Sequence, residues 1–130
     1  MTTDMRCAVV ANSYQVAVFD PDSPDAYPEW QSGDEDWVAT DSGLAIATVT
    51  DAELVVEVKI LDKDVAPPTY EGWEQVVRRR LTMGAGRLAI GNVLAATICH
   101  VEIGSPSCDV LVLRRPNSPD LHVLVYRDSR

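Results

Sequence analysis

The sequence predicts an all-β protein, an antiparallel β-sandwich of about eight short strands. Apolar and polar side chains alternate with a period of two in several segments, as in strands that bury one face. Clusters of Gly, Pro, Asn and Asp separate these segments at the short intervals that turns between strands require. A chain of 130 residues, 46% of them hydrophobic, can bury one core, and we expect a single domain over residues 1–130.

Four strands are expected in the first half of the chain, at residues 5–11, 14–19, 44–50 and 53–60, with a short apolar pattern at residues 37–40. In the second of these strands, Tyr14, Val16 and Val18 should share one face. The last two strands are separated by a short turn at Asp51 and Ala52, and we expect them to form a hairpin.

Four more strands are expected in the second half, at residues 87–92, 94–103, 108–113 and 121–126. Residues 73–83 fit two patterns. Trp73, Val76 and Arg80 follow helical spacing, whereas Val77 and Leu81 share one face of a strand. A helix here would make the domain α+β, and the strand rhythm elsewhere favours the sandwich.

Negative charge is concentrated in the first half of the chain. The protein carries a net charge of −9, and residues 1–58 hold twelve Asp or Glu but a single Arg, whereas residues 59–130 hold eight acidic and ten basic residues. A nucleic-acid binder needs a basic face, so we expect no nucleic-acid partner. The anionic half favours a cationic partner instead.

The sequence also predicts the cellular compartment of the protein. No apolar run reaches membrane-spanning length, and the N-terminus lacks the basic and then apolar pattern of a signal peptide. The three cysteines cannot form a closed set of disulfides, which fits buried thiols in a reducing compartment. We therefore expect a cytoplasmic protein with no membrane contact.

The acidic stretch at residues 20–41 is the best candidate for a functional surface. It holds eight Asp or Glu and no Lys or Arg, and its prolines predict a surface loop over residues 20–36. Aromatic residues ringed by charge are typical of binding hot spots, whereas a purely acidic loop would serve solubility. Exposed Trp30 and Trp37 would make the loop an interface, and buried ones would make it the lid of a core.

Other patterns point weakly to chemistry. Asp20, Asp22 and Asp25 resemble part of a calcium loop, but Pro24 and Gln31 stand where that loop needs ligands. No spacing of His and Cys is typical of a metal site. We expect neither a metal nor a cofactor, and read these carboxylates as a solvated turn.

Nucleophilic catalysis is a further alternative. Cys99 and His100 are adjacent and would point to opposite faces of a strand, so they cannot form a dyad. The fold could bring His122 near Cys99 or Cys108, in which case a reactive thiol is expected. We expect no catalytic residues, and interpret Arg78-Arg79-Arg80 as a solvated or internally paired run.

Residues 12–19, with the sequence Asn-Ser-Tyr-Gln-Val-Ala-Val-Phe, resemble the Ser-Tyr-x-Gln-Phe-x-Val-Phe strand of ComJ-like proteins. Those proteins are small inhibitors of the DNA-entry nuclease of competent bacilli. A Pro-containing loop, Trp30, Asp34-Glu35 and Asp41-Ser42-Gly43 follow in a similar order, so the resemblance spans about residues 12–60. The chain departs from the family at Pro67-Pro68 and in its run of three arginines.

The resemblance implies a soluble β-sandwich without catalysis that binds and blocks a nuclease, or another protein toxin of that kind. The charge supports this, because carboxylates can occupy a groove shaped for phosphates. The alternative is a β-sandwich that binds a small ligand in a pocket lined by Trp30, Trp37 or Trp73. The predicted partner-binding residues are Asp22, Asp25, Tyr27, Glu29, Trp30, Asp34, Glu35, Asp36 and Trp37.

Overall fold

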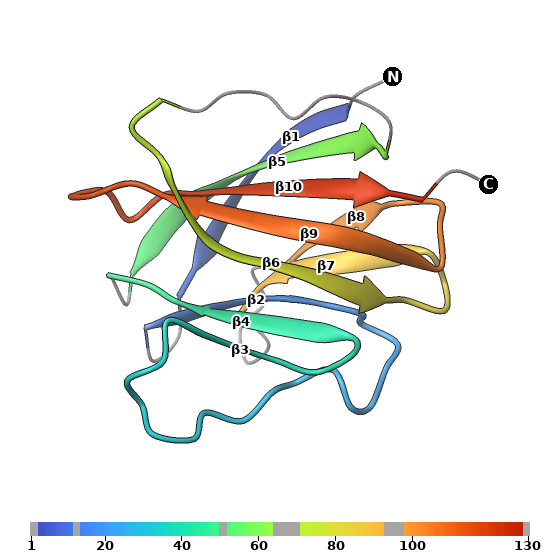
Figure 1. Ribbon diagram of the computed structural model, residues 1–130, viewed down its shortest axis with the longest axis horizontal. Coiled ribbons are helices and arrows are strands. Elements are labelled where there is room, and N and C mark those ends of the chain that lie inside the picture. Colours follow the sequence, from blue (N-terminus) through green and yellow to red (C-terminus); the bar gives the residue numbers. More distant parts are fainter. Residues whose placement is uncertain (1–2, 12–13, 50–51, 64–70, 93–97, 129–130) are drawn as a thin grey trace.

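The computed structural model describes residues 3–11, 14–49, 52–63, 71–92 and 98–128. These residues form ten strands in two five-stranded sheets that pack against each other (Figure 1). No helix occurs in the described ranges, and so none there is long and apolar enough to span a membrane. The predicted all-β sandwich is confirmed, with ten strands in place of about eight.

Sheet I has the strand order β1-β5-β10-β9-β6. Its neighbours are antiparallel, except that β10 runs parallel to β5 at the centre of the sheet. The strands are β1 (Thr3–Val10), β5 (Glu53–Asp62), β10 (Leu121–Arg127), β9 (Ser107–Arg114) and β6 (Glu74–Thr82).

Sheet II has the strand order β3-β4-β2-β7-β8 and is antiparallel throughout. Its strands are β3 (Trp37–Ala39), β4 (Gly43–Ala47), β2 (Gln15–Phe19), β7 (Arg87–Gly91) and β8 (Ile98–Glu102). Of the strand expected at residues 94–103, residues 94–97 lie outside the described ranges, as do Asp51 and Pro67-Pro68.

The main core lies between the sheets and is built from alternate residues of each strand. Val16 and Val18 of β2 are fully buried there, as are Val56 and Val58 of β5 from the opposite sheet. Burial of each such side chain stabilises the fold by about 1.5–3 kcal/mol. The period of two seen in the sequence therefore reports which face of each strand meets the other sheet.

The ambiguous segment at residues 73–83 is the edge strand β6, so the helical alternative is wrong. Val77 and Leu81 are buried, while Arg78 and Arg80 are exposed, as strand spacing predicts. A bulge between Gln75 and Val77 shifts the register against β9. The extra residue interrupts the alternation between the two faces of the strand. The apolar residues Val76 and Val77 are therefore adjacent, as they would be in a helical pattern.

The hairpin expected from residues 44–50 and 53–60 is not formed. Strand β4 lies between β3 and β2 in sheet II, whereas β5 lies between β1 and β10 in sheet I. Both edges of each strand are already occupied, so the two cannot pair. The chain crosses from one sheet to the other at this point, and β4 ends at Ala47.

Candidate functional site

The acidic loop, residues 20–36, runs along the outer face of sheet II (bottom of Figure 1). Beneath it lies a small apolar cluster formed by Ala17 and Phe19 of β2, Ala89 of β7 and Ala26 of the loop itself. Ala26 is completely buried. The loop is therefore a lid over this cluster, and its charged side chains form the outer surface of that lid.

Buried Asp20 fixes the start of the acidic loop. Its carboxylate accepts hydrogen bonds from the backbone N–H groups of Asp22 (2.9 Å) and Gly84 (3.3 Å). Its own N–H donates to the Ser42 carbonyl at 2.8 Å. Because these bonds use the Asp20 carboxylate within the protein, this residue shapes the loop and is not part of its exposed surface.

The middle of the acidic loop lies directly against β4. A Cβ atom added at Gly43 would lie 1.5 Å from the Ala26 carbonyl oxygen, so only glycine permits this approach. The Thr40 hydroxyl donates to the same carbonyl at 3.4 Å. The loop is thus held by close backbone contact as well as by apolar burial.

Glu35 organises the end of the acidic loop. Its carboxylate accepts hydrogen bonds from Gln31 N (2.7 Å), Ser32 N (3.0 Å) and Ser32 Oγ (2.6 Å). The hydrogen bonds from Ser32 Oγ and then from the Gln31 backbone lower the pKa of Glu35 to about 2. Glu35 therefore stays ionised and closes residues 31–35 into a fixed turn.

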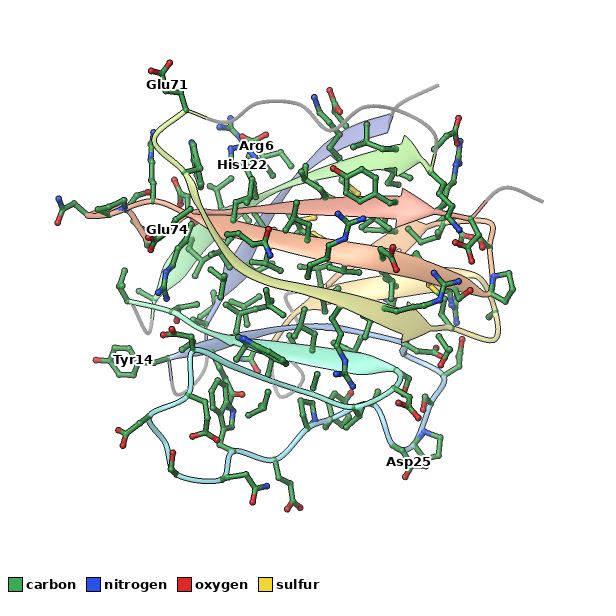
Figure 2. All side chains as sticks on the ribbon, in the orientation of Figure 1. Arg6, Tyr14, Asp25, Glu71, Glu74 and His122 are labelled. Atoms are coloured by element: carbon green, nitrogen blue, oxygen red, sulfur yellow. The ribbon has the colours of Figure 1, made fainter. Side chains whose placement is uncertain are left out.

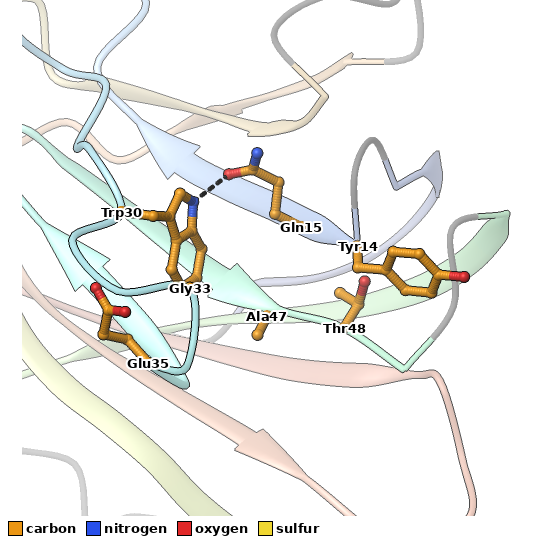
Figure 3. Close-up of a pocket in the computed structure, with 7 residues that line it drawn as sticks. All are labelled: Tyr14, Gln15, Trp30, Gly33, Glu35, Ala47 and Thr48. Carbon is orange, nitrogen blue, oxygen red and sulfur yellow. Dashed lines mark hydrogen bonds between the residues drawn. The ribbon is translucent and has the colours of Figure 1, made fainter.

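Trp30 is half-buried and forms one wall of an open pocket of about 280 Å³ (Figure 3). Its indole N–H donates to Gln15 Oε1 at 2.8 Å, which holds the ring against the start of β2. Neither Trp37 nor Trp73 lines this pocket, which is lined by Tyr14, Gln15, Trp30, Gly33, Glu35, Ala47 and Thr48.

The other two predicted aromatic residues differ in their surroundings. Trp37 begins β3 and packs, half-buried, against the main core. Tyr27 is 50% exposed, and its ring lies tilted against Phe19 at 5.1 Å between centroids. Tyr27 and Trp30 thus present aromatic surface on the loop, whereas Trp37 mainly supports the fold.

The predicted carboxylates fall into two groups. Asp22 forms an ion pair with Arg87 at 3.1 Å, and Asp36 forms one with Arg114 at 3.4 Å. Within the described ranges, no hydrogen bond or ion pair engages the three exposed carboxylates of Asp25, Glu29 and Asp34. These three charges are therefore available to a partner without breaking any internal contact.

Tyr14 was expected to share one strand face with Val16 and Val18, but it precedes β2 and does not share their burial. Tyr14 is 58% exposed and has a φ of 60°, in the left-handed region that a bulky residue rarely adopts. It lies at the opposite end of this face from Asp25 (Figure 2). The sequence does not reveal the exposure of Tyr14, because a positive φ interrupts the alternation of faces on which a strand prediction depends.

No group of three potential metal ligands comes together within the described ranges. Two of the three carboxylates that resembled a calcium loop have other partners: Asp20 binds backbone N–H groups, and Asp22 binds Arg87.

Cys108 and His122 do not form a catalytic pair. Cys108 is buried between the sheets, and burial raises its pKa to about 12. His122 lies five residues along β10 from Arg127, which is the residue that pairs with Cys108. At the rise of a β-strand, this separates His122 from Cys108 by about 17 Å. The His122 ring packs edge-on against Trp73. Burial and then the contact with Cys99 raise the pKa of Cys7 to about 12. Both thiols are therefore protonated at neutral pH.

The run Arg78-Arg79-Arg80 is largely engaged within sheet I. Arg78 pairs with Asp109 at 3.6 Å and lies over the Tyr126 ring, while Arg80 binds Asp109 and Asp128. Two of these three cations are thus internally paired, as expected from the sequence.

No protein-family model matches the sequence, and no curated protein matches it in sequence. Two solved structures share its fold. One is ComJ from Bacillus subtilis, an inhibitor of the DNA degrading activity of NucA, with a TM-score of 0.74 and 10% identity over 98% of each chain. The other is "Crocagin biosynthetic gene J", with a TM-score of 0.63 and 10% identity over 98% of this chain and 97% of the other.

At this identity the likeness shows a common fold. The resemblance to ComJ-like proteins, drawn from residues 12–60, is confirmed at the level of fold. It extends over the second half of the chain as well, where the sequence resemblance did not reach.

Proposed function

We propose that this protein is a non-enzymatic inhibitor that binds a basic protein, most favourably a nuclease, and blocks the groove in which that partner holds its substrate. The observation that carries the proposal is that the acidic loop presents three exposed carboxylates, Asp25, Glu29 and Asp34, that make no hydrogen bond or ion pair with the described residues, together with the aromatic side chains of Tyr27 and Trp30. The fold shared with ComJ, an inhibitor of the DNA degrading activity of NucA, supports it.

The electrostatics fit such a partner. A nuclease groove carries cationic groups that bind phosphates, and free carboxylates at separate positions can bind those groups instead. Asp22 and Asp36 add to this charge, because their exposed ion pairs with Arg87 and Arg114 contribute little stability and can be exchanged for a partner's cations. An immunity protein that binds a basic toxin would use the same electrostatic attraction.

The rigidity of the acidic loop favours binding as well. Asp20, Ala26 and Glu35 fix its start, middle and end to sheet II or to its own turns. A surface that is already ordered loses little conformational entropy on association. Such an inhibitor would act in the cytoplasm, where free thiols persist.

The test compares two triple variants with equal change in charge. Asp25→Asn, Glu29→Gln and Asp34→Asn remove the free carboxylates, while Asp4→Asn, Glu53→Gln and Glu71→Gln remove three exposed carboxylates elsewhere. Proteins captured from host lysate by the native chain are identified by mass spectrometry, and DNA cleavage by a captured nuclease is assayed with each variant. We expect the loop variant to inhibit about 10–100-fold more weakly and the control to match the native chain.

Equal inhibition by both triple variants would refute the role of the acidic loop. Capture of no nuclease or other basic protein would refute the proposed partner class.

A further inference from the structure

The pocket beside Trp30 lies at one end of sheet II, where β2 begins and β4 ends (Figure 3). Its volume of about 280 Å³ is small for a drug-sized ligand and sufficient for one long side chain. Trp30 forms a wall, Ala47 contributes apolar surface, and Gly33 leaves the opening free of a side chain. The shape therefore suits an extended group that enters from outside.

The indole of Trp30 is held ready for stacking. Its hydrogen bond to Gln15 fixes the ring against β2, so an incoming group meets an aromatic face that does not need to be ordered. A flat aromatic face of fixed orientation attracts cations through its quadrupole, and Trp does so best among the side chains.

Glu35 places a permanent negative charge on the same pocket. Three donors, Gln31 N, Ser32 N and Ser32 Oγ, already bind its two oxygens: two reach Oε1 and one reaches Oε2. A carboxylate has about four acceptor sites, so Oε2 retains one for a further donor. The pocket is thus lined by an indole ring and by a carboxylate that has one acceptor site left.

Two exposed side chains belong to the pocket or follow it in the sequence. Tyr14, which lines the pocket, is 58% exposed and held at a positive φ, and Val49, which follows the lining residue Thr48, is 73% exposed. Backbone strain of this kind is found preferentially at binding sites, where the surrounding structure maintains it. Exposed aromatic and aliphatic side chains around a charged pocket are typical of the centre of a protein interface.

We propose that this pocket takes one arginine side chain of the basic partner, stacked on Trp30 and hydrogen-bonded to Glu35. The inference rests on the proposed function and adds Tyr14, Gln15 and Val49 to the interface. Arginine fits better than lysine because its planar guanidinium stacks on the indole while one of its N–H groups reaches the carboxylate. Lysine offers a compact, strongly hydrated charge without a stacking face.

The test uses the full chain and three short peptides in place of the partner: acetyl-Gly-Arg-Gly-amide and its citrulline and lysine counterparts. Binding is followed through the indole N–H resonance of Trp30 in nitrogen-15 NMR spectra, assigned from its loss in Trp30→Phe. We expect the arginine peptide to shift this resonance with a dissociation constant on the order of millimolar. The neutral citrulline peptide should bind at least about tenfold more weakly, and lysine should be intermediate.

Glu35→Gln should weaken the arginine peptide about tenfold, and Glu102→Gln, an equal change of charge at the far end of sheet II, should not. Equal shifts from arginine and citrulline, or no shift of the Trp30 resonance, would overturn the pocket assignment. The peptide titration contains no nuclease. A specific response to the arginine peptide, combined with a lysate capture that yields no nuclease, would therefore reject the proposed function but not the pocket. A captured nuclease whose inhibition is unaffected by Glu35→Gln rejects the pocket alone.

Discussion

Gly43 is where the acidic loop comes closest to sheet II, because the Ala26 carbonyl occupies the space of a Cβ atom. Gly43→Ala should therefore displace the loop and lower the free energy of unfolding by about 2–3 kcal/mol. Urea denaturation followed by tryptophan fluorescence measures this.

Gly84→Ala is the matched control, since an added Cβ there meets nothing within 4 Å and the backbone N–H that binds Asp20 is kept. It should change stability by less than about 1 kcal/mol. A Gly43→Ala protein as stable as the Gly84→Ala protein would show that the loop is not held against β4.

Glu35 provides a pH-dependent prediction. Its pKa is lowered from 4.5 to about 2 by hydrogen bonds within the turn. A carboxyl whose pKa is lower in the folded state stabilises that state above pH 4.5, and the contribution is lost as the pH falls toward 2. Native protein should thus be more stable than Glu35→Gln at pH 6, and the difference should disappear between pH 4.5 and pH 2.

Thermal unfolding of both proteins across this pH range measures the effect. Glu102→Gln serves as the control, because it removes an exposed carboxylate of β8 that lies outside this turn. A constant difference between native protein and Glu35→Gln from pH 6 to pH 2 would contradict the assigned hydrogen bonds.

At the scale of elements, β6 is the end strand of sheet I and could pair with another chain. Arg79 lies between buried Val77 and Leu81 on the inward face, and no ion pair of Arg79 is found among the described residues. A charge that points inward from an edge strand opposes pairing, since a second sheet would bury it. Arg79→Val should therefore promote dimers or larger assemblies.

Size-exclusion chromatography with light scattering checks this across a range of concentrations. Arg78→Val removes the same charge from the outer face, and this variant should keep the oligomeric state of the native protein. If both variants associate equally, the loss of charge in general is responsible, and the inward position of Arg79 is not.

For these strands, the sequence predicts the buried face but not the pairing partner. Alternation predicted which residues of β2 and β6 face the core, because burial of one face imposes a period of two. Sheet membership could not be predicted, since β4 and β5 are adjacent in the chain yet belong to opposite sheets. Pairing partners depend on contacts between distant residues, which local patterns do not record.

The sequence predicts which types of residue form the candidate site, but not how these residues are arranged in space. Charge and proline content located the acidic loop, and its three free carboxylates are among the predicted residues. Tyr14 and Gln15 were expected only as part of a strand, because neither a positive φ nor an indole hydrogen bond can be recognised in the sequence. The predicted contact with a partner remains a prediction for all nine residues.

For the whole molecule, charge is distributed between two surfaces. The acidic loop covers the outer face of sheet II, whereas the outer face of sheet I carries paired charges such as Arg6 with Glu57. The loop is also tied to sheet I, since Arg114 binds Asp36. The turn that joins β3 to β4 is tied to sheet I as well, since Thr82 N donates to Asp41 O at 2.8 Å. The acidic surface is therefore part of the folded sandwich and not an appended tail.

This distribution predicts salt-dependent association. A net charge of −9 with one anionic face should steer a basic partner, so the association rate constant should fall about tenfold or more between low salt and about 0.15 M. The dissociation rate constant should change less. Surface plasmon resonance at several salt concentrations measures both, and a salt-independent association rate would contradict electrostatic steering.

The parallel pair at the centre of sheet I has a consequence for the order of folding. Val56 of β5 pairs with Leu121 of β10, 65 positions further along the chain, and β9 and β6 reach β5 only through β10. All strands of sheet II precede residue 103. On a ribosome, sheet II can thus assemble while sheet I still waits for its central strand, and the slow step is closure of this long loop.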